Sequence, residues 1–186
     1  MLFARLLLTA LLLCCSAANA FIGSAACQNC HAEEHAQWRG SHHDLAMQLP
    51  GPDTVLGNFD NTSFSYNGIT TRFYRKGDKF MVNTDGEDGK LQDFEVAYVF
   101  GVDPLQQYLL PLSRGRLQAL SIAWDTRPAA DGGQRWYHLY PDEKIDYKDP
   151  LHCSGTYQNW NTSCAECHST DLQKNYQAQS RSFDTK

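Results

Sequence analysis

The sequence has little positive charge, no long apolar run and no motif for nucleotide binding or hydrolysis. Its 16 Lys and Arg residues are outnumbered by 21 Asp and Glu residues, which gives a formal net charge of -5. This acidic balance argues against nucleic acid and anionic membranes as partners. We find no phosphate-binding loop, no nucleophile elbow and no pair of carboxylates at a spacing useful for catalysis.

The apolar run at residues 6–13 is too short to cross a bilayer, which takes about 20 residues. It follows Arg5 and precedes Ala18-Asn19-Ala20, which together are typical of a secretory signal peptide with an A-x-A cleavage site. An uncleaved anchor helix is the weaker interpretation. We therefore expect residues 1–20 to be a signal peptide, and the mature chain to be periplasmic or otherwise exported, with no permanent membrane span.

Two pentapeptides near opposite ends of the mature chain have the pattern Cys-x-x-Cys-His, at residues 27–31 and 164–168. This is the attachment signature of a c-type haem. Two thiols three positions apart can each add to one vinyl group of the same porphyrin, and the adjacent imidazole then faces the iron. The sequence therefore predicts two covalently bound haems c, held by Cys27, Cys30, His31, Cys164, Cys167 and His168.

Other interpretations of these pairs are a disulfide, a thioredoxin-like redox pair or half of a zinc site. A zinc site needs four ligands from paired knuckles, whereas each pair here carries its own histidine. A redox pair does not require that histidine twice. Of the seven cysteines, Cys14 and Cys15 leave with the signal peptide and four belong to the haem motifs. Only Cys153 remains, so the cysteines do not predict a disulfide framework.

Local patterns predict helices over residues 32–38, 42–48, 154–160 and 172–179, with Ser41 as a cap for the second. Between them, residues 62–66 and 69–74 predict a hairpin around Asn67-Gly68. Further strands are expected over residues 80–82, 94–100, 108–112, 117–124 and 135–140. We therefore expect an α+β fold in which helical c-type haem-binding segments at both ends flank an antiparallel β-rich middle.

The mature chain, residues 21–186, is expected to form one multihaem domain. Its parts are a first haem segment at 21–51, a β-rich region at 53–141 and a second haem segment at 142–186. The last residues, 181–186, show no capping pattern and close no predicted element. We therefore expect the chain to be truncated.

Several further stretches accompany the two motifs: Trp38-x-x-Ser41-x-His43, residues 100–108, 115–118, 123–125, 136–141 and 157–161. Together they resemble exported multihaem cytochromes related to cytochrome c554, especially the branch in which haem motifs precede tetratricopeptide repeats. The resemblance covers nearly all of the mature chain. It implies further haem or repeat domains in a full-length protein.

Each haem iron needs a proximal ligand, His31 or His168, and a sixth ligand that decides between electron transfer and substrate binding. His43 is the leading candidate for a sixth ligand because it fits the Trp-x-x-Ser-x-His pattern of the related cytochromes, and His42 is the alternative. Nothing in the sequence fixes which iron His43 would bind. The other candidates are less favoured: His138 and His152 for another haem, His35 as a solvated residue, and Met47 and Met81 as packing residues.

Two functions follow from this pattern. The favoured one is an electron carrier that exchanges electrons with redox partner proteins, and its acidic surface suits docking to a basic face. The alternative is an oxidoreductase module with one open iron that acts on a small nitrogen or sulfur compound, although no catalytic acid or base stands out. A weaker third interpretation is a binding module in which the haems are structural.

Overall fold

The computed structural model describes residues 21–186, so the expected signal peptide lies outside the described residues. The chain divides into two units, one ending at Arg39 and the other running from Gly40 to Lys186. The described part of the first unit contains η1 (Ser24–Cys27) and α2 (Ala32–Trp38), and none of its residues is buried. No helix in residues 21–186 is both long enough and apolar enough to span a membrane.

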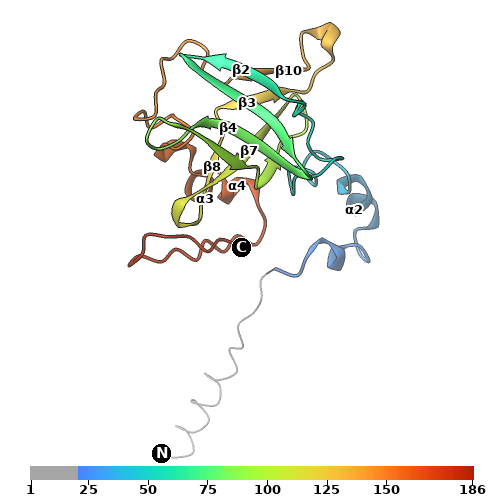
Figure 1. The fold of residues 1–186 in the computed structure, drawn as a ribbon. Coiled ribbons are helices and arrows are strands. Elements are labelled where there is room, and N and C mark those ends of the chain that lie inside the picture. The colour runs from blue at the N-terminus through green and yellow to red at the C-terminus, as the bar shows by residue number, and fades with distance from the viewer. Residues whose placement is uncertain (1–20) are drawn as a thin grey trace, which may run out of the picture. The chain divides into compact units, whose positions relative to one another are not determined.

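The second unit is built mainly from two antiparallel sheets (Figure 1). The four-stranded sheet has the order β2-β3-β4-β5, with β2 (Thr62–Tyr66), β3 (Ile69–Lys76), β4 (Lys79–Asp85) and β5 (Leu91–Glu95). The six-stranded sheet has the order β1-β6-β7-β9-β10, and β8 pairs separately with β7. Its strands are β1 (Met47–Gln48), β6 (Tyr98–Phe100), β7 (Leu105–Leu112), β8 (Arg116–Ala119), β9 (Ile122–Asp125) and β10 (Arg135–His138).

Short helices in the second unit lie in its connections and near the second motif. They are η2 (Ser113–Gly115), η3 (Ala129–Asp131), η4 (Thr156–Gln158), α3 (Trp160–Ser163) and α4 (Ala165–His168). The predicted hairpin is confirmed, because β2 and β3 pair in register around a turn with Asn67 at φ 47° and Gly68 at φ 82°. Positive φ at both positions is the geometry that the Asn-Gly dipeptide favours.

Apolar side chains from both sheets form one core around Phe59, which is 3% exposed. Its ring makes edge-on contacts with Phe73, Phe80, Tyr108 and Trp136 at centroid distances of 5.2 to 5.6 Å. The Phe73 and Trp136 rings, from different sheets, stack at 3.6 Å. The two sheets therefore pack face to face, and the aromatic residues that the sequence concentrates in this region hold them together.

Two predicted strands are divided where the chain passes from one pairing to another. In the run 94–100, the Val96 N–H donates to Phe80 in the four-stranded sheet, and the Ala97 N–H donates to Leu109 in the six-stranded sheet. The run 117–124 divides at Leu120 and Ser121, between β8 and β9. The alternation of apolar residues continues across these points of division, so the sequence pattern alone does not show where one strand ends and the next begins.

The expected α+β class is wrong, because the described chain is mostly β and has no helical segment at either end longer than the seven residues of α2. The helix expected over residues 42–48 is a single turn in which the Leu45 N–H donates to Ser41, and the chain then becomes β1. Met47 and Gln48 pair with Phe100 and Val99 of β6. Tertiary pairing therefore overrides the local helix preference of this stretch.

Residues 172–179 are not helical either. Gln173 and Lys186 exchange two backbone hydrogen bonds, and so do Gln177 and Ser182. Residues 173–186, named here the C-terminal ribbon, therefore form an antiparallel pair of extended segments. No helix or strand includes residues 181–186, although Ser182 forms an isolated bridge with Gln177.

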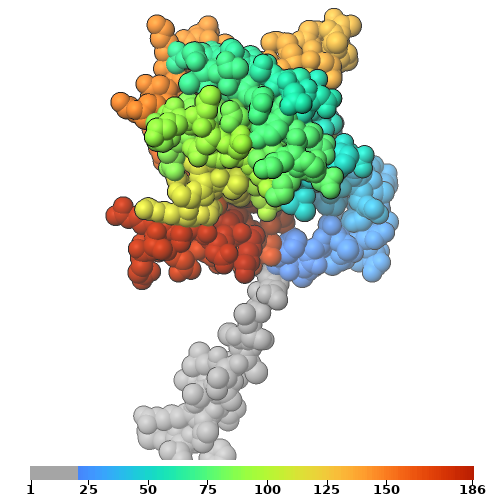
Figure 2. All heavy atoms as spheres, in the orientation of Figure 1, coloured from blue at the N-terminus to red at the C-terminus, as the bar shows by residue number. Residues whose placement is uncertain are grey.

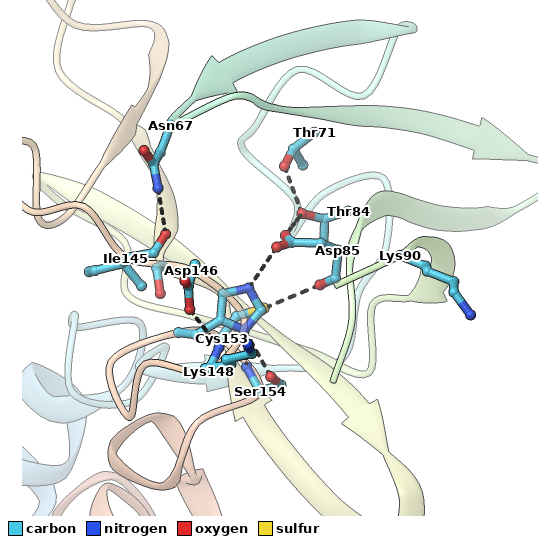
Figure 3. A network of polar contacts seen from close by, with 12 residues as sticks. Asn67, Thr71, Thr84, Asp85, Lys90, Ile145, Asp146, Lys148, Cys153 and Ser154 are labelled. Carbon is cyan, nitrogen blue, oxygen red and sulfur yellow. Dashed lines mark hydrogen bonds and ion pairs between the residues drawn. The ribbon is translucent and has the colours of Figure 1, made fainter. Parts of the chain in front are cut away.

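A buried polar network joins the end of β4 to the connection before the second motif (Figure 3). The His152 Nε2 atom lies 3.1 Å from Asp85 Oδ2, and its Nδ1 atom lies 2.8 Å from Ser154 Oγ. The Thr84 hydroxyl also contacts Asp85, and Thr71 contacts Thr84 at 2.7 Å. Asp85 and His152 are 7% and 6% exposed, so the network is shielded from water.

This environment shifts the pKa of both ionisable groups. Burial alone would raise the pKa of Asp85, but the hydrogen bond and charge of His152 lower it. Burial alone would lower the pKa of His152, but its contacts with Asp85 and Cys153 raise it to about 10. The pair is therefore ionised at neutral pH and holds β4 against residues 152–154.

Raising the pH should weaken the fold through this pair. The stabilisation from His152 is complete below its unfolded pKa of about 6.5 and is lost as the pH approaches 10. Between these values the folded state binds the extra proton, so the free energy of unfolding should fall by up to about 1.4 kcal/mol per pH unit. Guanidinium unfolding between pH 6.5 and 8.5 measures this slope. The variant Asp85→Asn should be less stable at pH 6.5 and lack most of the slope, and an equal slope in both proteins would contradict the assignment.

Candidate haem-binding site

The first motif lies in a short segment without a core of its own. Cys27 ends η1, and the N–H groups of Cys30 and His31 both donate to the Cys27 carbonyl, at 3.2 and 2.9 Å. His31 is the N-cap of α2, and the His35 N–H donates to its carbonyl at 2.9 Å. The backbone from Cys27 to His31 therefore forms one turn between η1 and α2, and Cys27, Cys30 and His31 are all exposed.

The helix that follows is locally favourable but short. Glu33 and Glu34 lie in its first turn, where negative charge complements the helix dipole. A seven-residue helix is marginal by itself in water, because nucleation costs more than so few hydrogen bonds return. A bound haem would provide the apolar surface that residues 21–39 otherwise lack. His35 is half-buried and lies 6.2 Å from Trp38 between ring centroids, so it is less solvated than predicted.

The second motif is carried by α3 and α4 and is held against the six-stranded sheet. The N–H groups of Cys167 and His168 donate to the Cys164 carbonyl at 3.1 and 3.0 Å, which puts the donor atoms on one turn. Ala165 is 0% exposed and packs against Leu109 and Trp160, whereas Cys167 and His168 are exposed. Burial and the neighbouring Cys167 raise the pKa of the half-buried Cys164 thiol.

Side-chain amides attach this motif to β8. Asn159 caps α3 by accepting from the Thr162 N–H, and its Nδ2 atom donates to Gln118 Oε1 at 2.8 Å. Asn161 is 0% exposed, accepts from the Leu117 N–H at 2.7 Å, and donates to Gly115 and Thr185. The segment before Cys164 is therefore fixed to the sheet by buried hydrogen bonds.

Partly exposed apolar side chains surround this turn. Phe100 lies 6.4 Å from the His168 ring, and the neighbouring partly buried residues are Met47, Tyr98, Leu117 and Leu172. The indole N–H of Trp160 is buried and has no acceptor in the described residues. Two thiols and one imidazole on a single turn, next to apolar surface, fit a covalently bound haem. No three His, Cys, Asp or Glu side chains within residues 21–186 cluster as a conventional metal site.

The remaining candidate ligands fall into two groups, two exposed histidines near β1 and two histidines with hydrogen-bond partners inside the second unit. His42 and His43 are exposed on the turn at residues 41–46, which leads into β1 beside Phe100. His138 stacks on Tyr66 at 3.9 Å, and its Nδ1 atom accepts from the Tyr140 N–H. Burial lowers the pKa of His138. Both ring nitrogens of His152 have partners, Ser154 and Asp85, so His152 is not free to bind a haem iron in this arrangement.

Sequence analysis missed the buried amides that position the second motif. Asn161 is fully buried and bonds to β8, but its position in the sequence carries no sign of that role. An Asn directly before a short helical pattern is a known cap signal, and it identifies Asn159. No local signal identifies Asn161, because its partners lie 44 and 24 residues away.

The sequence matches the family described as "Cytochrome c554 and c-prime" over residues 26–56. This segment contains the first motif and Trp38, Ser41 and His43, and it ends before the second motif. The match confirms the expected relation to c-type cytochromes, which bind haem c and transfer electrons. Searches of curated proteins and of solved structures find no match to the chain.

Removing the Asn161 side chain should loosen the second motif. Asn161→Ala leaves the Leu117 N–H without its acceptor, so the free energy of unfolding should fall by about 1–3 kcal/mol. Guanidinium unfolding followed by circular dichroism measures this loss. Ser163→Ala is the matched control, because Ser163 is exposed and lies two positions away. Equal stability of Asn161→Ala and the parent protein would show that the amide does not anchor the motif.

Proposed function

We propose that this protein is an exported multihaem c-type cytochrome that carries electrons through two covalently bound haems. The observation that carries the proposal is that the backbone of each Cys-x-x-Cys-His pentapeptide forms one turn, closed by the N–H groups of its second cysteine and its histidine on the carbonyl of its first cysteine. The family match at residues 26–56 supports haem at the first motif, and the same local geometry extends the proposal to the second.

In this proposal the chain's own residues bind and orient the cofactors. Cys27 and Cys30 hold one haem by thioether bonds, and Cys164 and Cys167 hold the other. His31 and His168 are the proximal iron ligands. When bound, haem supplies one-electron oxidation and reduction at its iron. The net charge of -5 favours a redox partner protein with a basic docking face.

His43 is proposed as a sixth ligand, and its position favours the second haem. It belongs to the same unit as the second motif and lies four residues before Met47. Met47 pairs with Phe100 of β6, and the Phe100 ring is the aromatic neighbour of His168. The strand pairing therefore ties the His43 turn to the region of the second motif. A sixth histidine ligand closes the iron to substrates and suits electron transfer.

The number of haems is measured by the mass of the holoprotein. Expressed with c-type maturation machinery, the mature chain should gain two haem masses by intact mass spectrometry. The double variant Cys164→Ala/Cys167→Ala should gain one. Cys153→Ala is the control for a cysteine outside the motifs and should still gain two. A parent protein without covalent haem would end the proposal.

Axial ligation is measured by visible spectroscopy and carbon monoxide binding. His43→Ala should turn one haem partly high-spin and allow it to bind carbon monoxide, whereas His42→Ala should leave the spectrum nearly unchanged. In the Cys164→Ala/Cys167→Ala background, adding His43→Ala should have no further effect, because the haem that it serves is absent.

Three other results would each contradict part of the assignment. If His43→Ala opens the remaining haem in that background, His43 serves the first haem. If only His42→Ala opens an iron, the wrong histidine has been chosen. Rapid carbon monoxide binding by the parent protein would favour the oxidoreductase alternative with an open iron.

A further inference from the structure

The C-terminal ribbon, β8 and residues 154–162 line an open cavity of about 510 Å³. The ribbon is fastened beside β8, because the Phe183 N–H donates to the Arg114 carbonyl at 2.9 Å and Thr185 accepts from Asn161. Figure 2 shows the ribbon in red, directly against the yellow segment near residues 113–118. The volume lies within the range of about 300–1,000 Å³ that is typical of small-molecule sites.

Three cationic side chains line the cavity, and its lining includes no acidic residue. Arg116 pairs with Glu87 at 2.6 Å, and Lys174 pairs with Glu166 at 2.6 Å, but neither glutamate lines the cavity. Arg181 is exposed and makes no ion pair with the described residues. In a protein with a net charge of -5, the cavity therefore has three cationic side chains in its lining, and one of them, Arg181, has no anionic partner within residues 21–186.

The other walls of the cavity are aromatic and polar. The rings of Tyr176 and Phe183 lie 4.9 Å apart at 46°, and Tyr176 is 51% exposed. The remaining lining includes the residues Ser154, Thr156 and Thr162, which bring hydroxyl groups. Aromatic rings provide apolar contact for a flat ligand, while arginine, lysine and hydroxyl groups bind phosphate, sulfonate or carboxylate oxygens.

The cavity is distinct from the haem-binding turn. Cys164, Cys167 and His168 do not line it. The residues of this region that face it are Asn159 and Thr162, and Glu166 is turned toward Lys174 at its border.

We propose that this cavity binds a small organic anion that combines a flat aromatic ring with a phosphate, sulfonate or carboxylate group. The ring packs against Tyr176 and Phe183, and the anionic group lies among Arg116, Lys174 and Arg181. This binding is a function beyond electron carriage, and it does not depend on the number of haems or on their axial ligands.

Flavin mononucleotide and riboflavin are the matched probes, because they share one ring system and differ in a phosphate. Isothermal titration of the oxidised holoprotein should show one site for flavin mononucleotide, with riboflavin binding at least about tenfold more weakly. Raising the salt concentration should weaken the binding of flavin mononucleotide. Equal binding of the two probes, or no binding of flavin mononucleotide, would overturn the proposal.

Variants locate the binding within the molecule. Arg181→Gln and Lys174→Gln should each weaken flavin mononucleotide binding by about fivefold or more. Tyr176→Ala should also weaken it. Lys144→Gln is the control, because it removes one positive charge from an exposed position outside the cavity and should change nothing.

Arg181 is exposed and makes no ion pair within residues 21–186, so its replacement should leave the unfolding curve unchanged and keep the test independent of folding. Unchanged affinity in Arg181→Gln, Lys174→Gln and Tyr176→Ala would place the probe elsewhere and would also overturn the proposal.

Discussion

The second motif depends on the edge of β8 that has no neighbouring strand. β8 pairs with β7 on one side only, so the backbone groups on its other side need partners. The chain before Cys164 supplies them, since Asn161 accepts from Leu117 and Gln118 forms a bridge with Asn159. The segment that presents the thiols is thus also the cover of a sheet edge. Its position is set by the geometry of the sheet rather than by a long helix.

The two haem motifs therefore have similar backbone turns but differ in the contacts that hold each turn in place. Around Cys27 and Cys30 the hydrogen bonds are all local, and no residue from Phe21 to Arg39 is buried. Around Cys164 and Cys167 the turn rests on a buried Ala165 and on amides from β8 and the preceding loop. In the proposed holoprotein, the first haem adds a core to its segment, whereas the second is added to a core that exists without it.

Local patterns are readable from the sequence, whereas most of the strand pairings are not. The haem motifs are recognisable because their donor atoms are close in sequence, and the Asn67-Gly68 hairpin is recognisable for the same reason. The helix expected over 42–48 is wrong because Met47 and Gln48 pair with β6, about 50 positions further along the chain. The helix expected over 172–179 is wrong because this stretch pairs with the residues that follow it, up to Lys186. The cationic cavity could not be predicted from the sequence either. Arg116 and Arg181 are 65 positions apart, and no local pattern indicates that they line the same cavity.

The separation in sequence between contacting groups also has a kinetic meaning. The Trp136 indole donates to Thr62 across 74 residues, and the amide of Asn161 reaches Leu117 across 44, whereas the bonds within the first motif span four or fewer. Closing long loops costs more entropy than closing short ones and slows folding. The turn around Cys27 therefore needs no distant contact for its backbone hydrogen bonds, whereas the surroundings of Cys164 need the assembled sheet. The two motifs therefore differ in how much of the fold must form before their hydrogen bonds are complete.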